Sequence, residues 1–131
     1  MPDYASIAEL FARYGAAQDL HDRELMATTL AADANATIHI VGMDSIGPLE
    51  SRDTIVSFFG DILDSQTDQR RHSITNIRRL DGDRVNAYLT LIVTDAGETV
   101  VKSAGIYEVT VAEEDGALRL SSFVLSLDRA F

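Results

Sequence analysis

Cysteine is absent from the chain, and lysine occurs only once, as Lys102. The absence of cysteine excludes disulfides, thiolate zinc sites, iron–sulfur clusters and thiol nucleophiles. A mechanism through a lysine Schiff base has one candidate residue at most. Catalysis by this chain is therefore expected to depend on His, Asp and Tyr side chains that move protons.

The chain also has few basic residues and no long hydrophobic run. It has 11 Lys and Arg residues and 21 Asp and Glu residues, which gives a net charge of -10. A field of that sign repels nucleic-acid phosphates and anionic lipid. Neither a secretory hydrophobic segment nor an apolar run of transmembrane length occurs. We expect a cytoplasmic protein that binds neither nucleic acid nor membrane.

What is present fits one ordinary globular domain. Of the 131 residues, 46% are hydrophobic and 24% are charged. A chain of this length buries roughly two thirds of its unfolded surface, so it needs no metal or disulfide to fold. Because no linker, repeat or low-complexity tract divides the sequence, a single domain over residues 1–131 is expected.

The first half of the chain has mostly helical periodicity. A first helix is predicted from an apolar stripe at positions i, i+3, i+4 and i+7, formed by Ile7, Leu10, Phe11 and Tyr14. Asp22 is suited to cap a short second helix, and Ser51 a third one with its apolar stripe over residues 55–63. Between them, residues 35–41 predict a strand, and Gly42, Gly47 and Pro48 predict a loop.

The second half has the alternation of strands. We predict four of them, over residues 70–80, 85–93, 99–112 and 118–127. In the last strand the apolar phase slips near Ser121 and Ser122, which predicts a β-bulge that bends the sheet. Three helices followed by an antiparallel meander predict an α+β fold in which the helices cover one face of the sheet.

Motifs for phosphate, metal or nucleophile chemistry are missing. The sequence has no phosphate-binding glycine loop, nucleophile elbow, HExxH helix or EF-hand loop. We therefore expect neither a metal site nor a cofactor. Of the three imidazoles, His39 is out of phase with its apolar neighbours and is expected to leave the core, and His21 is expected in a loop.

His72 is the imidazole best placed for function. On its predicted strand it shares one face with Ile74 and Asn76. It is either a core histidine bonded to a carbonyl or a general base, which needs a carboxylate partner. Asp19, where the first helix ends, is the candidate partner; otherwise it is an exposed turn residue. Tyr14 is either a core aromatic or a hydrogen-bond donor to a carbonyl or departing oxygen.

Arginines flank His72 on its strand. Arg70, Arg71, Arg78 and Arg79 are distributed over both faces, which suggests a solvated strand end or a contact between subunits.

Several motifs, taken in order, resemble the SnoaL-like domain of the nuclear-transport-factor-2-like superfamily. The resemblance extends from about Ser6 to Asp128, and members with this Tyr, Asp and His pattern include scytalone dehydratase and bile-acid 7α-dehydratase. The motifs that carry it are Tyr14-(four residues)-Asp19, Ala31-Ala32-Asp33-Ala34, Ser51-Arg52-Asp53-Thr54-Ile55, Arg71-His72-(three residues)-Asn76 and Asp81-Gly82-Asp83.

The resemblance implies a cone-shaped α+β barrel, in which three helices and a strongly curved, mixed but mainly antiparallel sheet enclose a deep apolar pocket. It implies that Asp19 and His72 form a proton-removing dyad and that Tyr14 assists the carbonyl or the leaving group. Five further residues are expected to bind the substrate: Asn76, Ile55, Phe59, Ile74 and Tyr107.

Two functions follow as hypotheses. The first is a small cofactor-independent lyase (dehydratase) or isomerase that acts on a hydrophobic carbonyl compound resembling a polyketide, steroid or terpenoid. The second is a non-catalytic ligand-binding or structural module, such as the small subunit of an aromatic-ring dioxygenase. Under either hypothesis we expect a homo-oligomer, a dimer or trimer, that forms through the outer face of the sheet.

Overall fold

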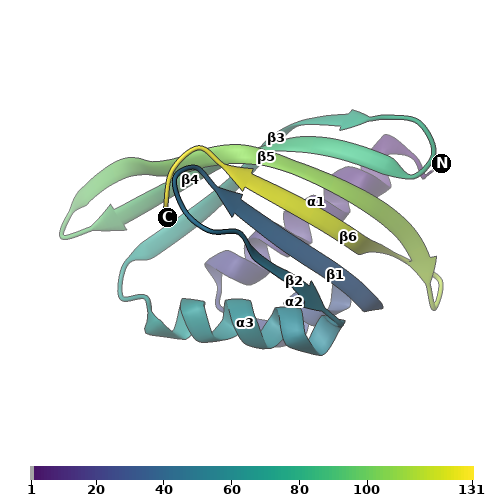
Figure 1. Cartoon of the computed structure of the whole chain (residues 1–131), viewed down its shortest axis with the longest axis horizontal. Helices are drawn as coiled ribbons and strands as arrows, with labels where there is room; N and C mark the ends of the chain where they lie inside the picture. Colours follow the sequence, from purple (N-terminus) through teal and green to yellow (C-terminus); the bar gives the residue numbers. More distant parts are fainter. Residues whose placement is uncertain (1) are drawn as a thin grey trace.

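Helices and a single sheet form two layers in the computed structural model, which describes residues 2–131 (Figure 1). Three helices lie on one face of the sheet, and the chain runs in the order α1, α2, β1, β2, α3, β3, β4, β5, β6. The helices are α1 (Tyr4–Asp19), α2 (Arg23–Thr28) and α3 (Arg52–Ser65). The strands are β1 (Leu30–Ile40), β2 (Ile46–Glu50), β3 (Gln69–Arg79), β4 (Arg84–Asp95), β5 (Glu98–Glu114) and β6 (Ala117–Leu127).

Each helix begins at a polar side chain that accepts a backbone N–H. Asp3 caps α1 through Ser6 N, Asp22 caps α2 through Leu25 N, and Ser51 caps α3 through Thr54 N. These caps satisfy donors that have no partner inside the helix. The predicted caps Asp22 and Ser51 are thus confirmed.

The six strands form one mixed sheet in the order β2-β1-β6-β5-β4-β3. β1 and β6 are parallel, and the other neighbours are antiparallel. The predicted meander of the last four strands is confirmed. The bulge is confirmed as well, because Thr110 pairs with Ser122 and Val111 with Leu120, which leaves Ser121 without a partner in the ladder.

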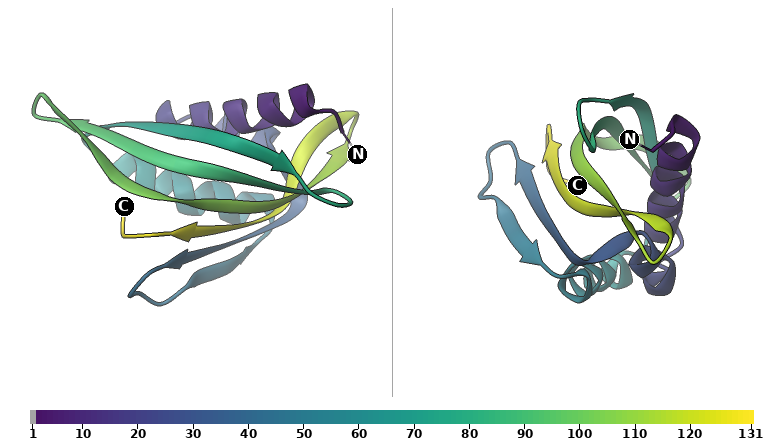
Figure 2. Two further views of the ribbon diagram at one scale, coloured as in Figure 1. Left: turned by 90° about the horizontal axis from the view of Figure 1, so that it is seen from above. Right: turned by 90° about the vertical axis from the view of Figure 1, so that its right-hand side faces the viewer.

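The predicted cone is wrong for this chain. The sheet is twisted but open and not strongly curled, with β2 and β3 as its two edges (Figure 2). Closure would require these edges to approach one another, but α3 lies against β1 and β2 while α1 lies against β3. The helices occupy the space between the edges, so a local bulge bends one strand without rolling up the sheet.

Two local predictions at the start of the sheet are also wrong. β1 begins at Leu30, earlier than the predicted residue 35, and residues 46–50 form an edge strand where a loop was predicted. Gly47 and Pro48 read as turn residues in the sequence, but Pro is tolerated on an edge strand because its missing N–H is not needed there.

Aromatic rings join the two layers. The ring of Phe123 on β6 is 5.7 Å from Tyr14 of α1, 6.3 Å from Phe59 of α3 and 6.0 Å from Tyr107 of β5, measured between centroids. Phe123 is only 1% exposed. The pairs with Tyr14 and Tyr107 are edge-to-face, a geometry that adds to the free energy that burial of each ring contributes.

Removal of the central ring tests how much of the stability depends on this cluster. We expect Phe123→Ala to lower the free energy of unfolding by about 3–5 kcal/mol, because the cavity cannot collapse between two layers. Urea denaturation measures the loss. Val41→Ala in the turn after β1 is the control, since Val41 is exposed, and its change should stay within about 0.5 kcal/mol. Equal effects of the two substitutions would contradict the role of the cluster.

Candidate active site

The site begins where α1 ends. His21 has a φ of 53°, and two backbone bonds close the helix: His21 N donates to Gln18 O over 3.2 Å and Asp22 N donates to Ala17 O over 2.9 Å. This is a Schellman motif, with His21 in the left-handed position that glycine usually takes. It fixes Asp19 as the last residue of the helix.

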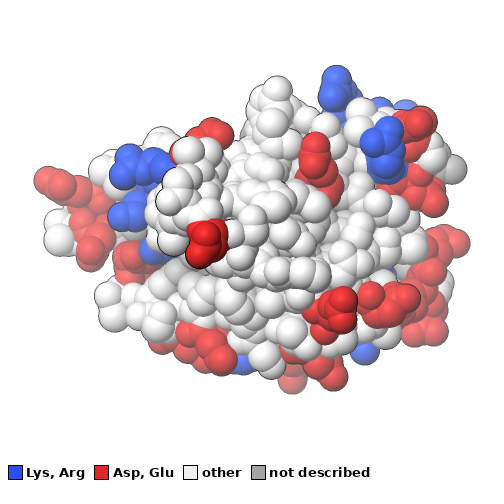
Figure 3. Space-filling model, viewed as in Figure 1, with Lys and Arg blue, Asp and Glu red and all other residues white. Residues whose placement is uncertain are grey.

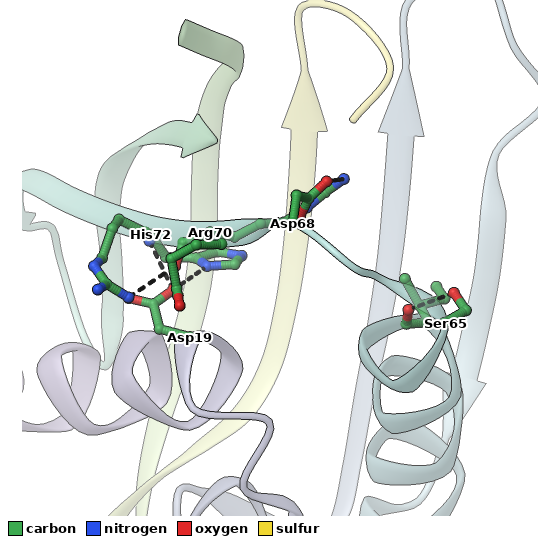
Figure 4. A network of polar contacts seen from close by, with 8 residues as sticks. Asp19, Ser65, Asp68, Arg70 and His72 are labelled. Atoms are coloured by element: carbon green, nitrogen blue, oxygen red, sulfur yellow. Dashed lines mark hydrogen bonds and ion pairs between the residues drawn. The ribbon is translucent and has the colours of Figure 1, made fainter. Parts of the chain in front are cut away.

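Asp19 receives two hydrogen bonds from one residue of β3. Its Oδ1 accepts the backbone N–H of His72 over 2.9 Å and lies 2.7 Å from Nδ1 of the same residue (Figure 4). The side chains are 16% and 9% exposed, respectively. Because an ionised carboxylate only accepts, this contact favours the neutral imidazole tautomer in which Nδ1 carries the proton and Nε2 does not.

A glycine allows the helix to approach the strand at this point. A Cβ built on Gly15 would lie 3.4 Å from the carbonyl oxygen of His72 and 3.5 Å from Cδ1 of Ile74. A Cβ would just reach van der Waals contact with β3, so a side chain larger than that of alanine at residue 15 would push α1 away from β3. The short distance between Asp19 and His72 therefore depends on a small residue at this position.

A pocket lies between the helices and the sheet, beside the Asp19–His72 pair. Its empty volume is about 460 Å³, a figure that includes open solvent at its mouth. Most of the lining is apolar and comes from β1, α3, β4, β6 and the last residue: Ile38, Phe59, Ile62, Leu63, Leu89, Leu91, Leu125, Leu127 and Phe131. Polar side chains in the lining are Gln18, Gln66, Arg70, His72 and Tyr107.

The predicted site residues are brought together only in part. His72, Phe59 and Tyr107 line the pocket, and Asp19 contacts His72. Ile55 is buried in the core, Ile74 packs against the core, and neither belongs to the lining. Asn76 is exposed and has a φ of 52° at an irregularity in the pairing of β3 with β4, so it leaves the face that carries His72.

Tyr14 is a core residue whose hydroxyl contacts the site through another side chain. Nε2 of Gln18 donates to the Tyr14 hydroxyl over 2.9 Å, and Gln18 rather than Tyr14 lines the pocket. Sequence reasoning missed Gln18, although its position one turn after Tyr14 placed it on the same helix face.

Arg70 differs from the sequence-based expectation of a solvated arginine. It is 8% exposed and lines the pocket. Asp68 accepts from its Nε over 2.9 Å and from its Nη2 over 3.3 Å. These bonds hold the pKa of Asp68 below its ordinary value. Arg71, by contrast, is exposed as expected.

No cluster of three metal-binding side chains occurs in the part of the chain that the structure describes. None of the helices within residues 2–131 has the length and apolar character that a membrane span requires. The other two histidines lie outside the pocket: His39 is exposed and bonds Ser45, and His21 lies in the turn after α1.

Comparison with known families gives one decisive match. The SnoaL-like domain matches residues 1–124. The chain belongs to the SnoaL-like domain family. It shares the nuclear-transport-factor-2-like, cystatin-like fold of that family over nearly its whole length. A search of curated proteins found no significant match.

Solved structures similar to this SnoaL-like domain share its fold at low sequence identity. ActVI-ORFA from Streptomyces coelicolor is 18% identical, with a TM-score of 0.80 over 95% of this chain and 96% of that one. A Catenulispora acidiphila protein in complex with S-DNPA is 24% identical, with a TM-score of 0.79 over 95% and 92%. The beta subunit of a putative aromatic-ring-hydroxylating dioxygenase from Novosphingobium aromaticivorans is 22% identical, with a TM-score of 0.73 over 97% and 90%.

The buried tyrosines make this SnoaL-like domain sensitive to alkaline pH. Burial raises the pKa of Tyr14 and of Tyr107, and the charge of Asp19 raises that of Tyr107 further. A tyrosine of the unfolded chain ionises near about pH 10. Because the folded state keeps both protons to higher pH, its stability is complete below about pH 10 and declines as the pH rises further.

We therefore expect Tyr107→Phe to lose stability less steeply than the wild type between about pH 10 and pH 11.5. Urea denaturation at several pH values measures the slope. Tyr4→Phe is the matched control, since Tyr4 is exposed, and it should keep the wild-type slope. A wild-type slope in Tyr107→Phe would mean that the Tyr107 hydroxyl is not buried in solution.

Proposed function

We propose that this SnoaL-like domain is a cofactor-independent lyase, of the dehydratase type, or an isomerase that acts on a hydrophobic carbonyl compound. The observation that carries the proposal is the 2.7 Å contact between Asp19 Oδ1 and His72 Nδ1 beside an apolar pocket. A histidine whose Nδ1 is held by a carboxylate has Nε2 free to accept a proton, as a general base requires.

The proposed reaction begins at the carbon next to the carbonyl. Its C–H bond breaks, the proton goes to Nε2 of His72, and the electron pair forms the enolate of the substrate. Asp19 stabilises the imidazolium that results. The enolate then either expels a hydroxyl from the neighbouring carbon, which takes the proton from the His72 imidazolium and leaves as water, or it recovers that proton at another carbon. The first outcome is dehydration and the second is isomerisation.

Tyr14 has an indirect part in this proposal. Its hydroxyl is bonded to Gln18, and the Gln18 amide lines the pocket. We therefore assign Tyr14 as a positioning residue that holds the Gln18 amide against the ligand.

The lining supports a hydrophobic substrate, and a compound resembling a polyketide, steroid or terpenoid would suit it. Nine of the lining residues are aliphatic or phenylalanine: Ile38, Phe59, Ile62, Leu63, Leu89, Leu91, Leu125, Leu127 and Phe131. A protein of the same fold was crystallised with a small molecule, S-DNPA, which supports a ligand-binding role for the fold.

A non-catalytic binding or structural module is the second candidate. It is supported by the similarity of the fold to the beta subunit of a putative aromatic-ring-hydroxylating dioxygenase. That similarity concerns the fold alone, whereas the Asp19–His72 contact is a feature of side chains. The first proposal is therefore preferred, and an activity assay distinguishes the two.

Isotope exchange tests the base without knowledge of the natural substrate. We expect the protein to accelerate deuterium uptake at the acidic carbon of β-tetralone in D2O, followed by proton NMR. His72→Ala should reduce the enzymatic rate constant by about 10²–10⁴-fold, because a general base contributes that much. Asp19→Asn should reduce it as well, because the amide no longer holds the reactive tautomer.

His39→Ala is the control, since His39 is an exposed imidazole that bonds Ser45 outside the pocket. It should exchange at the wild-type rate. Exchange that survives in both His72→Ala and Asp19→Asn would contradict the mechanism. Tight binding of β-tetralone without exchange in the wild type would favour the binding module instead.

We also propose that two copies associate through the outer face of the sheet. Tyr88, Val101 and Ile106 on β4 and β5 are large apolar side chains left exposed on that face. In the view of Figure 3, charged side chains gather toward the rim of the molecule and its centre is largely uncharged. Sedimentation at micromolar concentration should give the mass of two chains, and the mass of a single chain would contradict the proposal.

A further inference from the structure

The pocket contains one buried cation that the proposed proton transfer does not use. Arg70 is 8% exposed and belongs to the lining. A buried charge is costly unless it is paired and hydrogen-bonded. Asp68 supplies the pairing through Nε and Nη2 of Arg70, at 2.9 Å and 3.3 Å.

The pairing with Asp68 leaves part of the guanidinium free. Arginine has five N–H donors, and Asp68 accepts from two of the nitrogens. Among residues 2–131, no acceptor other than Asp68 bonds the Arg70 side chain. The remaining donors belong to a side chain that lines the pocket, so they are available to an oxygen atom of a ligand.

Arg70 and His72 lie on the same face of β3. Alternate residues of a strand share a face, and two residues span about 7 Å along the strand. Both side chains belong to the pocket lining, whereas Arg71 between them is exposed. In Figure 4, the Asp68–Arg70 pair lies between the Asp19–His72 pair and the end of α3. One strand therefore presents a base and a cation to the same pocket.

A second polar group at this end of the pocket also lacks a partner. Oε1 of Gln66, which directly follows α3, is buried with no hydrogen bond to any described residue, and Gln66 lines the pocket. Buried polar atoms are generally hydrogen-bonded in folded proteins. The end of the pocket near residues 66–70 thus offers polar groups that a polar part of a ligand would satisfy.

From this arrangement we infer that Arg70 is a catalytic residue that binds the carbonyl oxygen of the ligand and stabilises the enolate. This inference rests on the proposed function. When the C–H bond breaks, the proton goes to His72 and the electron pair moves onto the carbonyl oxygen, where the guanidinium donates to it. A cation in an apolar pocket stabilises such a developing charge far more than it would in water.

The Asp68–Arg70 pair also determines whether the site favours a neutral or a charged oxygen on the ligand. Asp68 already balances the charge of Arg70, so a ligand carboxylate would bring an uncompensated negative charge into an apolar pocket. A neutral carbonyl, such as that of a ketone or lactone, accepts a hydrogen bond without that cost. The site is therefore suited to neutral carbonyl compounds over carboxylates.

Binding of two matched probes tests the oxygen site separately from the base. β-Tetralone and tetralin have the same ring skeleton and differ in the ketone oxygen, and NMR titration gives both dissociation constants. The wild type should bind the ketone about tenfold more tightly or better, as expected for a hydrogen bond from a charged group. Arg70→Met should lose that preference. Arg71→Met removes the same charge on the exposed face and should keep it.

Arg70→Met leaves Asp68 without its partner, which is liable to weaken the fold. The double variant Asp68→Asn with Arg70→Met removes both charges together and should lose the ketone preference while keeping the circular dichroism spectrum of the wild type. Asp68→Asn alone leaves Arg70 unbalanced, and it should increase the affinity for tetralin-2-carboxylate relative to β-tetralone. Unchanged ketone preference in folded Arg70→Met or in the double variant would overturn the inference. Lack of any ketone preference in the wild type would overturn it too.

The exchange assay separates this inference from the proposed function. Arg70→Met should lower the rate constant for deuterium uptake into β-tetralone by about 10²-fold, the effect of losing one donor to a developing oxyanion. Ketone preference that depends on Arg70, without exchange in the wild type, would support the oxygen site and refute the base. Exchange that depends on His72 but not on Arg70 would support the base and refute the oxygen site.

Discussion

The hydrogen bonds between Asp19 and His72 are the interaction on which the rest of the site depends. One carboxylate oxygen accepts both the backbone N–H and Nδ1 of the same histidine. It therefore fixes the position of β3 relative to α1 and the orientation of the imidazole at once. A carboxylate at the C-terminus of a helix is electrostatically unfavourable, by roughly 0.3–1 kcal/mol. The two hydrogen-bond donors of His72 offset that cost. The ionised carboxylate of Asp19 is therefore stabilised by the contact between β3 and the end of α1.

The same constraint organises the polar side of the pocket. Once β3 is fixed against α1 at His72, the alternation of the strand places Arg70 on the same face. The segment that joins α3 to β3 then brings Asp68 to the guanidinium. A short stretch of chain thus supplies a base and a cation, while the other strands and α3 supply apolar walls. The walls define the shape of the pocket, and β3 defines its chemistry.

Much of this structure follows from local patterns in the sequence. Residues close to one another in the chain predict the helix caps at Asp22 and Ser51. They also predict the meander and the bulge at Ser121. The parallel pairing of β1 with β6 and the edge strand β2 were not predictable in this way, because they depend on packing between distant segments. The degree of sheet curvature is likewise set by where α1 and α3 lie, not by a single bulge.

In the candidate site, too, the features that were missed depend on contacts that local sequence patterns do not encode. The residues alone left Asp19 either as the partner of His72 or as an exposed turn residue, because no local pattern joins a helix end to a strand 53 residues away. Only the resemblance to a family implied that the two form a pair. Arg70 was misread because alternation shows which residues share a face but not which face is buried. Asn76 was misplaced because its positive φ interrupts that alternation. Gln18 was missed because its spacing from Tyr14 shows that the two share a helix face but not which of them lines the pocket.

The most direct test of this account is the protonation of the His72 ring. Nitrogen-15 NMR of histidine-labelled protein, assigned with His72→Ala, reports which ring nitrogen carries the proton in the neutral imidazole. We predict that Nδ1 is protonated and Nε2 is not, and that Asp19→Asn abolishes this strict preference. A neutral His72 with its proton on Nε2 would contradict the account, because the nitrogen assigned as the base could not then accept a proton.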